Sequence, residues 1–289
     1  MKKPTILITG SEGQLGSELK RLSIQYTEFD FLFIDKNDVD LTTETAFVDF
    51  ANRYQLTFLI NCAAYTAVDL AEKENEVAHQ VNAQVPFMLA RYCQQKNIKL
   101  IHISTDYVFD GSGNVPLTET SVTNPVSVYG VTKLEGESKV LGCLSDAYVI
   151  RTAWVYSIFG KNFLKTMLTL GKQREELSVV FDQIGSPTCA GDLADAILKV
   201  IERIEAGDDF PGTYHYSNEG VTSWYDFAVE IMRRANLPCR VNPILTSEYP
   251  TPARRPVFSV LDKTKIKNVF KLTIPHWTTS LEKTIKELA

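Results

Sequence analysis

Short apolar runs alternate with amphipathic segments through the first part of the chain. A short apolar run bounded by turn residues is typical of a strand buried on both faces in a parallel sheet. The more polar segment 38–42 is interpreted as a short edge segment that leads into a helix cap. The six strand-like runs expected in this part are residues 5–9, 31–34, 38–42, 57–64, 99–104 and 148–152.

Between these runs, apolar residues recur every three or four positions, the spacing that places them on one face of a helix. The helices expected here span residues 17–22, 45–54, 77–92 and 129–141. Strands that alternate with helices in this way predict an α/β fold with a doubly wound parallel sheet of Rossmann type.

The regular alternation ends after the last of these strands, and we expect a second domain from there. Residues 1–155 are predicted to form a dinucleotide-binding Rossmann domain, and residues 156–289 mainly a smaller, substrate-binding domain. Segments 177–188 and 212–217 are expected to return to the first domain, and the proline-rich region 236–278 is expected to be loop-rich. This part contains expected helices at 162–170, 193–204, 225–235 and 279–288 and expected strands at 177–182 and 212–217.

Composition narrows the class of protein. The chain of 289 residues has 44% hydrophobic residues and a formal net charge of −5, which suits a sizeable core. No long basic run is present, so we expect no nucleic-acid partner. No apolar run is long enough to span a membrane, and the N-terminus lacks the apolar segment of a signal peptide. The five cysteines are scattered, which fits reduced thiols, and we expect a cytoplasmic protein without a membrane partner.

The first strand leads into a turn that contains Gly10, Gly13 and Gly16, and a helix pattern follows directly. Glycines let the backbone turn tightly and approach a pyrophosphate, whose charge is stabilised by the N-terminus of the helix. The spacing is G-x-x-G-x-x-G rather than G-x-G-x-x-G. Taken alone, this turn indicates a phosphate-binding loop, with a plain loop as the alternative.

Asp35 closes the second strand-like run, 19 residues beyond Gly16. A carboxylate near this spacing typically binds the adenosine ribose of a dinucleotide, although a turn residue at a strand end is the alternative. Lys36 follows directly, and its ammonium group could accept a 2′-phosphate. We therefore expect either NADH or NADPH as the cofactor.

Tyr129 and Lys133 lie four residues apart at the start of an expected helix, so they share one face. A free tyrosine has a pKa of roughly 10, and a neighbouring ammonium group lowers the pKa of a phenol. Such a pair can act as a general acid, although an ordinary amphipathic helix start also explains it. Ser104 and Thr105 end a strand-like run, where Rossmann-type folds hold their substrates.

Longer motifs occur in the chain order that this interpretation requires, and several of them are specific. With them, nearly the whole chain resembles the extended short-chain dehydrogenases, and within these the dTDP-4-dehydrorhamnose reductase family. The motifs are the glycine turn at 10–16, N-C-A-A-Y-T-A-V-D at 61–69, S-T-D-Y-V-F-D-G at 104–111, N-P at 124–125, Y-G-x-x-K at 129–133, R-T-x-W-V-Y at 151–156, G-x-P-T at 185–188 and A-R-R-P at 253–256.

The resemblance implies an oxidoreductase that reduces the C4 ketone of dTDP-4-dehydro-L-rhamnose to dTDP-L-rhamnose with NADPH or NADH. This would be the last step of dTDP-rhamnose biosynthesis, which serves cell-surface polysaccharides. Tyr129 would protonate the developing alkoxide, and Thr105 would donate a hydrogen bond to the same oxygen. Lys133 would lower the pKa of Tyr129 and hold the nicotinamide ribose.

The resemblance also implies the binding residues. Asp106, Trp154 and Arg255 would contact the sugar nucleotide, and Arg255 could bind the diphosphate through bidentate hydrogen bonds. Core packing is the alternative for Trp154, and a solvated loop arginine is the alternative for Arg255. The cofactor site would comprise Gly10, Gly13, Gln14, Leu15, Gly16, Asp35, Lys36, Asp40, Leu41, Ala63, Ala64, Tyr65, Thr66, Ile103, Tyr129 and Lys133.

One departure from the family concerns a metal. Some relatives dimerise around a metal that carboxylates bind, and Glu18 fits the first of these positions. Cys189, Ala190 and Gly191 follow the P-T turn where a glutamate would be needed, and Asp192 is shifted. We expect no metal site, and either a monomer or a homodimer.

Two alternatives remain, one from another class of protein and one closer to the main interpretation. Some proteins of this fold are non-catalytic, such as the dinucleotide-binding regulatory subunit of methionine adenosyltransferase. The complete set of Thr105, Tyr129 and Lys133 argues against that alternative. The chain could instead be another sugar-nucleotide reductase or an epimerase, and an epimerase would retain NAD through purification.

Overall fold

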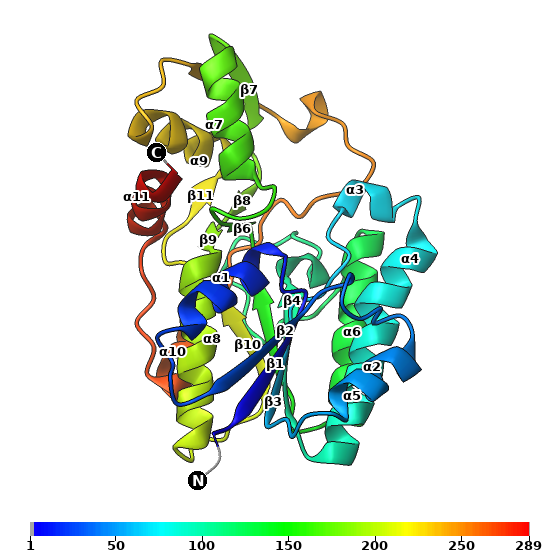
Figure 1. The fold of residues 1–289 in the computed structure, drawn as a ribbon. Coiled ribbons are helices and arrows are strands. Elements are labelled where there is room, and N and C mark those ends of the chain that lie inside the picture. The colour runs from blue at the N-terminus through cyan, green and yellow to red at the C-terminus, as the bar shows by residue number, and fades with distance from the viewer. Residues whose placement is uncertain (1–2, 289) are drawn as a thin grey trace.

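The central feature of the fold is a parallel sheet of six strands (Figure 1). The computed structural model describes residues 3–288. The strands of the sheet are β1 (Thr5–Thr9), β2 (Asp30–Ile34), β3 (Phe58–Asn61), β4 (Lys99–Thr105), β5 (Tyr148–Thr152) and β10 (Gly212–Tyr216). Their spatial order is β10-β5-β4-β3-β1-β2, with every neighbouring pair parallel. β2 and β3 flank β1 on opposite sides, so the predicted α/β fold of Rossmann type is confirmed.

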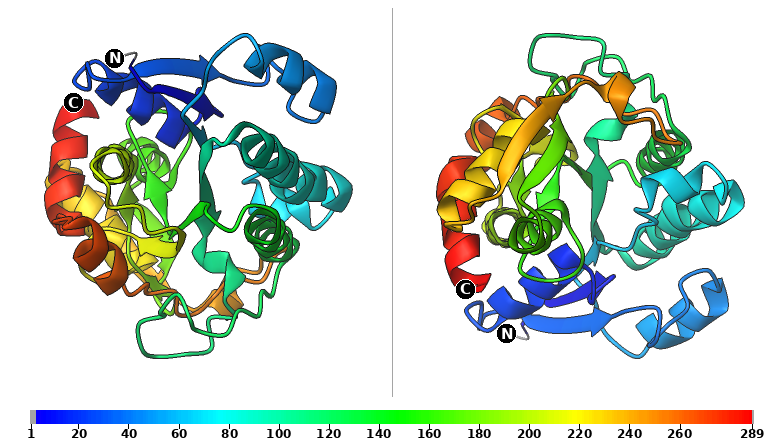
Figure 2. Two further views of the ribbon diagram at one scale, coloured as in Figure 1. Left: turned by 90° about the horizontal axis from the view of Figure 1, so that it is seen from below. Right: turned by 90° about the horizontal axis from the view of Figure 1, so that it is seen from above.

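Helices cover both faces of this sheet, which explains why its strands read as continuous apolar runs. On one face lie α1 (Gln14–Ser23), α8 (Ala190–Glu205) and α10 (Thr264–Phe270), which share a core with Ile6 and Ile8. On the other face lie α2 (Glu44–Ala51), α5 (Val85–Lys96) and α6 (Val128–Cys143), packed on Leu7, Leu59 and Leu100. The views along the sheet show these two helical layers on opposite sides of the strands (Figure 2).

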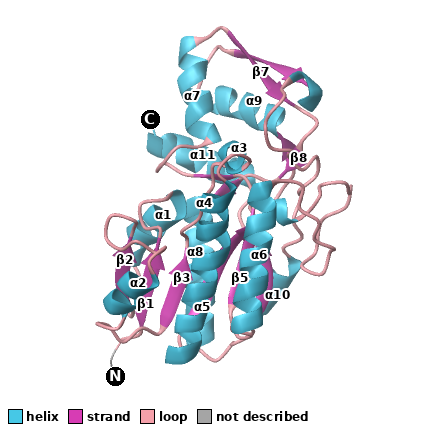
Figure 3. Cartoon of the chain, turned by 90° about the vertical axis from the view of Figure 1, so that its right-hand side faces the viewer, coloured by secondary structure: helices cyan, strands magenta, loops and turns pink. Residues whose placement is uncertain are grey.

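The rest of the chain forms a smaller unit beyond the carboxyl ends of the strands (Figure 3). It has its own apolar core, which includes Tyr156, Phe227 and Trp277. Its helices are α7 (Phe163–Gln173), α9 (Trp224–Arg234) and α11 (Trp277–Leu288). Its strands form three pairs: β6 (Val155–Tyr156) with β9 (Thr188–Cys189), β7 (Glu176–Val180) with β12 (Arg240–Ile244), and β8 (Ile184–Gly185) with β11 (Thr222–Ser223).

Two predictions about strands were wrong. Segment 38–42 is a turn in which Asp40 Oδ1 accepts hydrogen bonds from the backbone and hydroxyl of Thr42, so β10 supplies the sixth strand of the sheet instead. Segment 177–188 stays outside this sheet, because β7 pairs with β12. The region 236–278 is loop-rich, as predicted, and also contains β12 and α10. β12 includes Pro243, a residue that an outer strand tolerates.

The predicted helix 77–92 is divided in the structure. It consists of α4 (Asn75–His79), a π-helical turn (Gln80–Gln84) and α5, and the short helix α3 (Val68–Ala71) precedes it. Short 3-10 turns occur at Asp106–Val108 and Thr246–Glu248.

Helix α6 packs against the π-helical turn closely enough to require a glycine. A Cβ at Gly136 would lie 2.1 Å from the backbone oxygen of Asn82, and Asn82 itself is fully buried. At Gly142, near the end of the same helix, a Cβ would meet no atom within 4 Å. The position of α6 against the turn therefore depends on Gly136.

These two glycines give a matched test of that packing. Gly136→Ala should destabilise the protein by about 2 kcal/mol or more, because the added methyl group forces α6 away from backbone atoms that cannot move aside. Gly142→Ala should stabilise it by up to about 1 kcal/mol, since alanine favours the helix. Urea denaturation of both variants measures the free energy of unfolding, and equal effects of the two substitutions would contradict the prediction.

Candidate active site

The glycine turn follows β1, the strand at which the strand order of the sheet reverses, since β2 and β3 lie on opposite sides of it. Gly10 follows β1 with φ +66°, and a Cβ there would lie 2.7 Å from the backbone nitrogen of Ala63, directly after β3. A Cβ at Gly16 would lie 2.3 Å from the carbonyl oxygen of Gly10. Gly13 is the N-cap of α1 and gives it no side-chain cap. The N-terminus of α1 and the crevice between β1 and β3 therefore form a cradle suited to a pyrophosphate.

Asp35 lies beside this cradle. Its carboxylate accepts hydrogen bonds from the backbone nitrogen of Glu12 at 3.2 Å and of Lys36 at 2.8 Å, so the end of β2 is tied to the glycine turn. Lys36 is exposed, and Leu41 is half-buried. Asp40 lies further on, and its carboxylate is used in the turn before α2. The structure thus places Asp35 near the glycine turn and gives Asp40 a local structural partner.

Two buried asparagines hold the segment that follows β3, and sequence reasoning assigned them no role. Asn61 Oδ1 accepts hydrogen bonds from Thr9 Oγ1 at 2.7 Å and from the backbone nitrogen of Ala63 at 3.2 Å. Asn82 bonds the backbone nitrogen of Tyr65 at 2.8 Å and its carbonyl oxygen at 3.1 Å. The one feature of the sequence that could have indicated the role of Asn61 is its polar amide at the end of an apolar strand. Ala64 and Thr66 lie in the segment that these bonds position.

Gln14 and Leu15, at the start of α1, have different roles. Gln14 Oε1 accepts a hydrogen bond from Asn162 Nδ2 at 3.0 Å, and its amide lies 3.5 Å from the carbonyl oxygen of Val155. This side chain therefore connects the glycine turn to the smaller unit. Leu15 is buried in the core between α1 and the sheet, where it packs.

Tyr129, Lys133 and Thr105 are brought together by the packing of α6 on the end of β4. Ser127 caps α6 through a hydrogen bond from the backbone nitrogen of Gly130 at 3.2 Å, which fixes the first turn. Lys133 Nζ donates a hydrogen bond of 2.7 Å to the carbonyl oxygen of Ile103, two residues before Thr105. The three side chains are buried, with 9%, 2% and 5% of their residue surface exposed.

Burial dominates the protonation of this group. It raises the pKa of Tyr129 to about 12, and a hydrogen bond with Thr105 opposes the change. The sequence predicted a lowered pKa for Tyr129, and in the free protein burial raises that pKa instead. Burial also lowers the pKa of Lys133 to about 8, against the opposing negative charge of Glu137. Tyr129 is therefore a proton donor that stays protonated at neutral pH.

Asp106 lies beside Thr105 and has an unused acceptor. Its Oδ1 accepts a hydrogen bond of 3.0 Å from Thr105 Oγ1, whereas its buried Oδ2 has no hydrogen-bond partner among residues 3–288. Burial raises the pKa of Asp106 to about 6. A buried acceptor without a partner is costly, so this oxygen suits a hydroxyl group of a bound ligand.

Arg255 reaches the same region from the smaller unit. The ring of Tyr107 packs edge-on against Tyr129 at 5.4 Å between centroids, and the charge of Arg255 acts on Tyr107. Arg255 Nη2 donates a hydrogen bond of 2.7 Å to Asp69 Oδ2, and Asp69 Oδ1 accepts another from the backbone nitrogen of Ala253 at 3.2 Å. The segment that carries Arg255 is thus fastened to α3.

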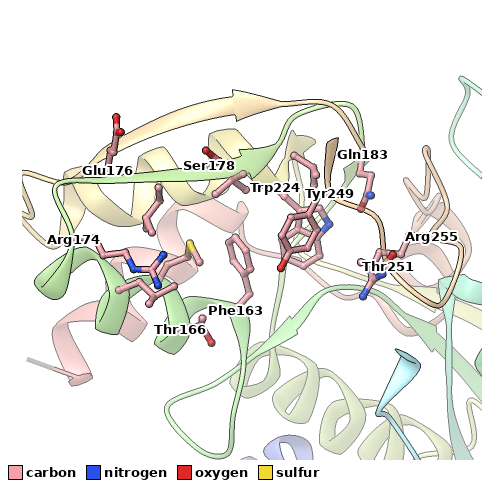
Figure 4. A pocket seen from close by; sticks show the side chains of 15 residues that line it. Phe163, Thr166, Arg174, Glu176, Ser178, Gln183, Trp224, Tyr249, Thr251 and Arg255 are labelled. Atoms are coloured by element: carbon pink, nitrogen blue, oxygen red, sulfur yellow. The ribbon is translucent and has the colours of Figure 1, made fainter. Parts of the chain in front are cut away.

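A cavity of about 730 Å³ lies in the smaller unit, within the size range of small-molecule sites (Figure 4). Phe163, Trp224 and Tyr249 supply aromatic surface to it, and Arg255 lies at one end of the labelled set. Trp154 supports this wall from behind, since its indole stacks on that of Trp224 with ring centroids 3.7 Å apart. The structure therefore gives Trp154 a packing contact that also shapes the cavity.

The two acidic residues considered for a metal have protein partners. Glu18 Oε1 accepts a hydrogen bond from Ser157 Oγ at 2.6 Å, and its Oε2 pairs with Arg21 at 2.7 Å. Asp192 Oδ2 accepts hydrogen bonds from Asn218 Nδ2 at 2.7 Å and from the hydroxyl of Ser280. Within residues 3–288, no group of histidine, cysteine, aspartate and glutamate side chains has an arrangement suited to a metal ion.

A buried polar network, which the sequence did not reveal, lies beneath the Tyr129–Lys133 face of α6. Glu137 forms a bidentate pair with Arg151 of β5, with Oε2 to Nη2 at 2.7 Å. Arg151 Nη1 lies 3.5 Å from His215 Nε2, and His215 Nδ1 lies 3.0 Å from the carbonyl oxygen of Leu117. These contacts fit a neutral imidazole that carries its proton on Nδ1, and burial lowers the pKa of His215 to about 3.

The parallel sheet, the glycine cradle and the buried Thr-Tyr-Lys group define an extended short-chain dehydrogenase/reductase, a class of oxidoreductases that use nicotinamide dinucleotides. A family model described as the RmlD substrate binding domain matches residues 4–289, and the chain belongs to this family. The predicted resemblance to dTDP-4-dehydrorhamnose reductases is confirmed.

The chain is similar to proteins of this family along almost its whole length. A dTDP-4-dehydrorhamnose reductase of Aggregatibacter actinomycetemcomitans is 39% identical over 285 residues, which cover 96% of this chain and 97% of the relative. A solved structure of such a reductase from Clostridium acetobutylicum is 42% identical, with a TM-score of 0.93 and coverage of 98% and 99% of the two chains. Another, from Bacillus anthracis in complex with NADP, is 38% identical, with a TM-score of 0.94 and coverage of 99% and 100%.

Over residues 3–288, none of the helices combines the length and apolar character needed to cross a membrane.

The buried His215 predicts a specific dependence of stability on pH. In the folded protein its pKa is lowered to about 3, whereas an ordinary histidine takes up a proton near pH 6.5. Between these values the unfolded state binds more protons, so stability falls as the pH falls. The contribution of this residue is about 1.4 kcal/mol per pH unit.

His215→Asn removes this titration and keeps a donor for the Leu117 carbonyl group. A plot of the free energy of unfolding between about pH 4 and pH 6.5 should therefore be shallower for the variant than for the parent. Urea denaturation at several pH values gives the two slopes. Parallel lines that differ only in height would mean that the folded protein binds a proton at His215 as readily as the unfolded chain.

Proposed function

We propose that this protein reduces the C4 ketone of dTDP-4-dehydro-L-rhamnose to dTDP-L-rhamnose. The observation that carries the proposal is the buried group of Thr105, Tyr129 and Lys133 at the carboxyl end of β4. This group lies in a chain that is 42% identical to a solved dTDP-4-dehydrorhamnose reductase. The proposed reaction is the last step of dTDP-rhamnose biosynthesis.

Each residue of this group has a role in the proposed reaction. The reduced nicotinamide, when bound, supplies a hydride to C4 of the sugar, and negative charge develops on the carbonyl oxygen. Tyr129 donates its phenolic proton to that oxygen, and its raised pKa keeps the proton in place until then. The Thr105 hydroxyl donates a hydrogen bond to the same oxygen, and the ammonium group of Lys133 stabilises the phenolate that remains.

The residues present fit a dinucleotide. A Cβ at Gly10 or Gly16 would clash with the backbone of Ala63 or of Gly10, so glycine at both positions permits the tight turn that sets the N-terminus of α1 beside β1 and β3, where a pyrophosphate would bind. Asp35 lies beside the turn and would bind the adenosine ribose, while exposed Lys36 would accommodate a 2′-phosphate. We therefore propose that both NADPH and NADH serve as hydride donors. The other residues proposed to line this site are Gly13, Gln14, Leu15, Asp40, Leu41, Ala63, Ala64, Tyr65, Thr66 and Ile103.

The sugar nucleotide would lie between the Thr105 end of β4 and the cavity of the smaller unit. The aromatic wall with Trp224 suits a nucleobase, and the Arg255 guanidinium suits the diphosphate. In this structure the Arg255 guanidinium donates a hydrogen bond to the Asp69 carboxylate. A bound diphosphate would replace that carboxylate as the partner of Arg255. The unpartnered oxygen of Asp106 would accept a hydrogen bond from a sugar hydroxyl.

This division gives each part of the chain a function. Residues 1–155 would bind mainly the dinucleotide, and residues 156–289 mainly the sugar nucleotide, with β10 completing the sheet of the first part. All five cysteines are free thiols, which supports a reducing, cytoplasmic location. The protein would work there as a monomer or a homodimer.

Tyr129→Phe tests the proposed chemistry. The substitution preserves the ring and its packing on Tyr107 but removes the proton donor. We expect kcat to fall by about 10²- to 10⁴-fold, while the affinity for NADPH stays close to that of the parent. Oxidation of NADPH and of NADH with dTDP-4-dehydro-L-rhamnose gives kcat and KM, and fluorescence titration gives the cofactor affinity.

The parent protein supplies the control for this experiment. A regulatory subunit would show no turnover in the parent, and an epimerase would retain NAD after purification and consume no NADPH. A folded Tyr129→Phe variant with the kcat of the parent would exclude Tyr129 as the acid.

Trp154→Ala tests the aromatic wall. Because Trp154 stacks on Trp224, its removal should let that indole move and should raise the KM for the sugar nucleotide about tenfold. The affinity for NADPH should change little, since the glycine cradle lies elsewhere. Trp154→Phe keeps an aromatic ring and should recover most of the affinity. Equal losses for both ligands, or a large fall in Tm, would assign Trp154 to core packing alone.

A further inference from the structure

Three residues on one face of α6 contact three successive residues at the end of β4. The Thr105 side chain acts on the Tyr129 phenol and opposes the rise of its pKa, and Lys133 donates a hydrogen bond to the carbonyl oxygen of Ile103. One turn further on, the Glu137 carboxylate accepts a short hydrogen bond from Ser104 Oγ. The two proposed catalytic residues of α6 and Glu137 therefore form one row along the end of a single strand.

Glu137 is buried and held by several hydrogen bonds. Only 2% of its surface is exposed, and its carboxylate accepts hydrogen bonds from Arg151 Nε at 3.0 Å and Nη2 at 2.7 Å. Arg151 belongs to β5 and also lies over the Phe109 ring, 5.1 Å from its centroid. Glu137 thus joins α6 to both β4 and β5 at a site that is closed to solvent.

We propose that Glu137 is a positioning residue for the reduction, which holds Lys133 and Thr105 in register and keeps the Lys133 ammonium group charged. The proposal rests on the roles assigned above to Tyr129 and Lys133. Glu137 does not touch the reacting atoms. It acts through Ser104, the neighbour of Thr105, and through its charge on the helix that carries Lys133.

Charge supports the second part of this role. Burial lowers the pKa of Lys133 to about 8, and the negative charge of Glu137 is the largest opposing influence. Without that charge the pKa of Lys133 would be lower still, and the ammonium group would be lost closer to neutral pH. The other charged or titratable groups around the row are Cys62 after β3, His102 of β4, Asp106, Tyr129, Arg151 of β5 and His215 of β10.

Three variants separate positioning from structural support. Glu137→Gln removes the charge and keeps an oxygen that can accept from Ser104. Glu137→Met with Arg151→Met replaces the whole ion pair by apolar side chains, an exchange that buried pairs often tolerate without loss of stability. Ser104→Ala removes only the link to β4. Glu135→Gln, on the same helix with its carboxylate near the surface, is the matched control for loss of one negative charge.

For each folded variant the pH profile of kcat, the KM values and the Tm are measured with NADPH and dTDP-4-dehydro-L-rhamnose. Loss of Glu137 should lower kcat by about ten- to a hundredfold, as expected when reacting groups are misplaced. It should also move the alkaline limb of the profile to lower pH, while the KM for the sugar nucleotide stays within about twofold of that of the parent. Glu135→Gln should match the parent in all three measurements.

Several results would overturn the proposal. One is a folded variant without Glu137 that keeps both the kcat of the parent and the alkaline limb of its pH profile. Another is a variant whose kcat falls while the alkaline limb of the pH profile stays where it is in the parent. If both Glu137 variants unfold, Ser104→Ala decides, and a kcat equal to that of the parent would reject the link to Thr105. Absence of turnover in the parent would instead reject the proposed function, so the two failures are distinguishable.

Discussion

The burial of the Lys133 ammonium group is the constraint around which this structure is organised. A buried cation is costly unless it is hydrogen-bonded and balanced by opposite charge. The carbonyl oxygen of Ile103 supplies the hydrogen bond and Glu137 the charge, and both require α6 to lie tightly against β4. On a neighbouring face of α6, Gly136 permits the helix to pack closely against Asn82. Packing, sheet topology and the candidate chemistry therefore meet on one helix.

The sequence predicted the fold well for strands that are buried on both faces of the sheet. β1, β3 and β5 are covered on both faces by helices, so their sequences are largely apolar and easily recognised. Prediction failed where pairing depends on distant parts of the chain. Nothing local distinguishes the turn at 38–42 from a short polar edge, or shows that β12 pairs with β7. Pro243 argued against a strand, and an outer position makes it acceptable.

Prediction of the candidate site shows the same limit. Motif spacing located Tyr129, Lys133 and Thr105, because residues four apart on a helix share a face wherever that helix lies. The same spacing could not show how deeply the helix is buried, so the direction of the Tyr129 pKa was wrong for the free protein. Glu137 and Asn82 stood in ordinary helical patterns. Their roles arise from contacts with β4 and with the segment after β3, which no local pattern encodes.

The two halves of the proposed site differ in how completely they are formed before a ligand arrives. On the α6 side Lys133 and Glu137 are already fixed by buried hydrogen bonds, so little ordering of these two residues remains when a ligand binds. On the other side, Arg255 is held by Asp69, and the unpartnered oxygen of Asp106 awaits a donor. A diphosphate bound by Arg255, as proposed, would release Asp69 from its ion pair with Arg255, while the hydrogen bond from Ala253 to Asp69 could remain. In that proposed arrangement the affinity for the sugar nucleotide would be reduced by the strength of the Arg255–Asp69 ion pair, whereas the geometry around Tyr129 does not involve that pair.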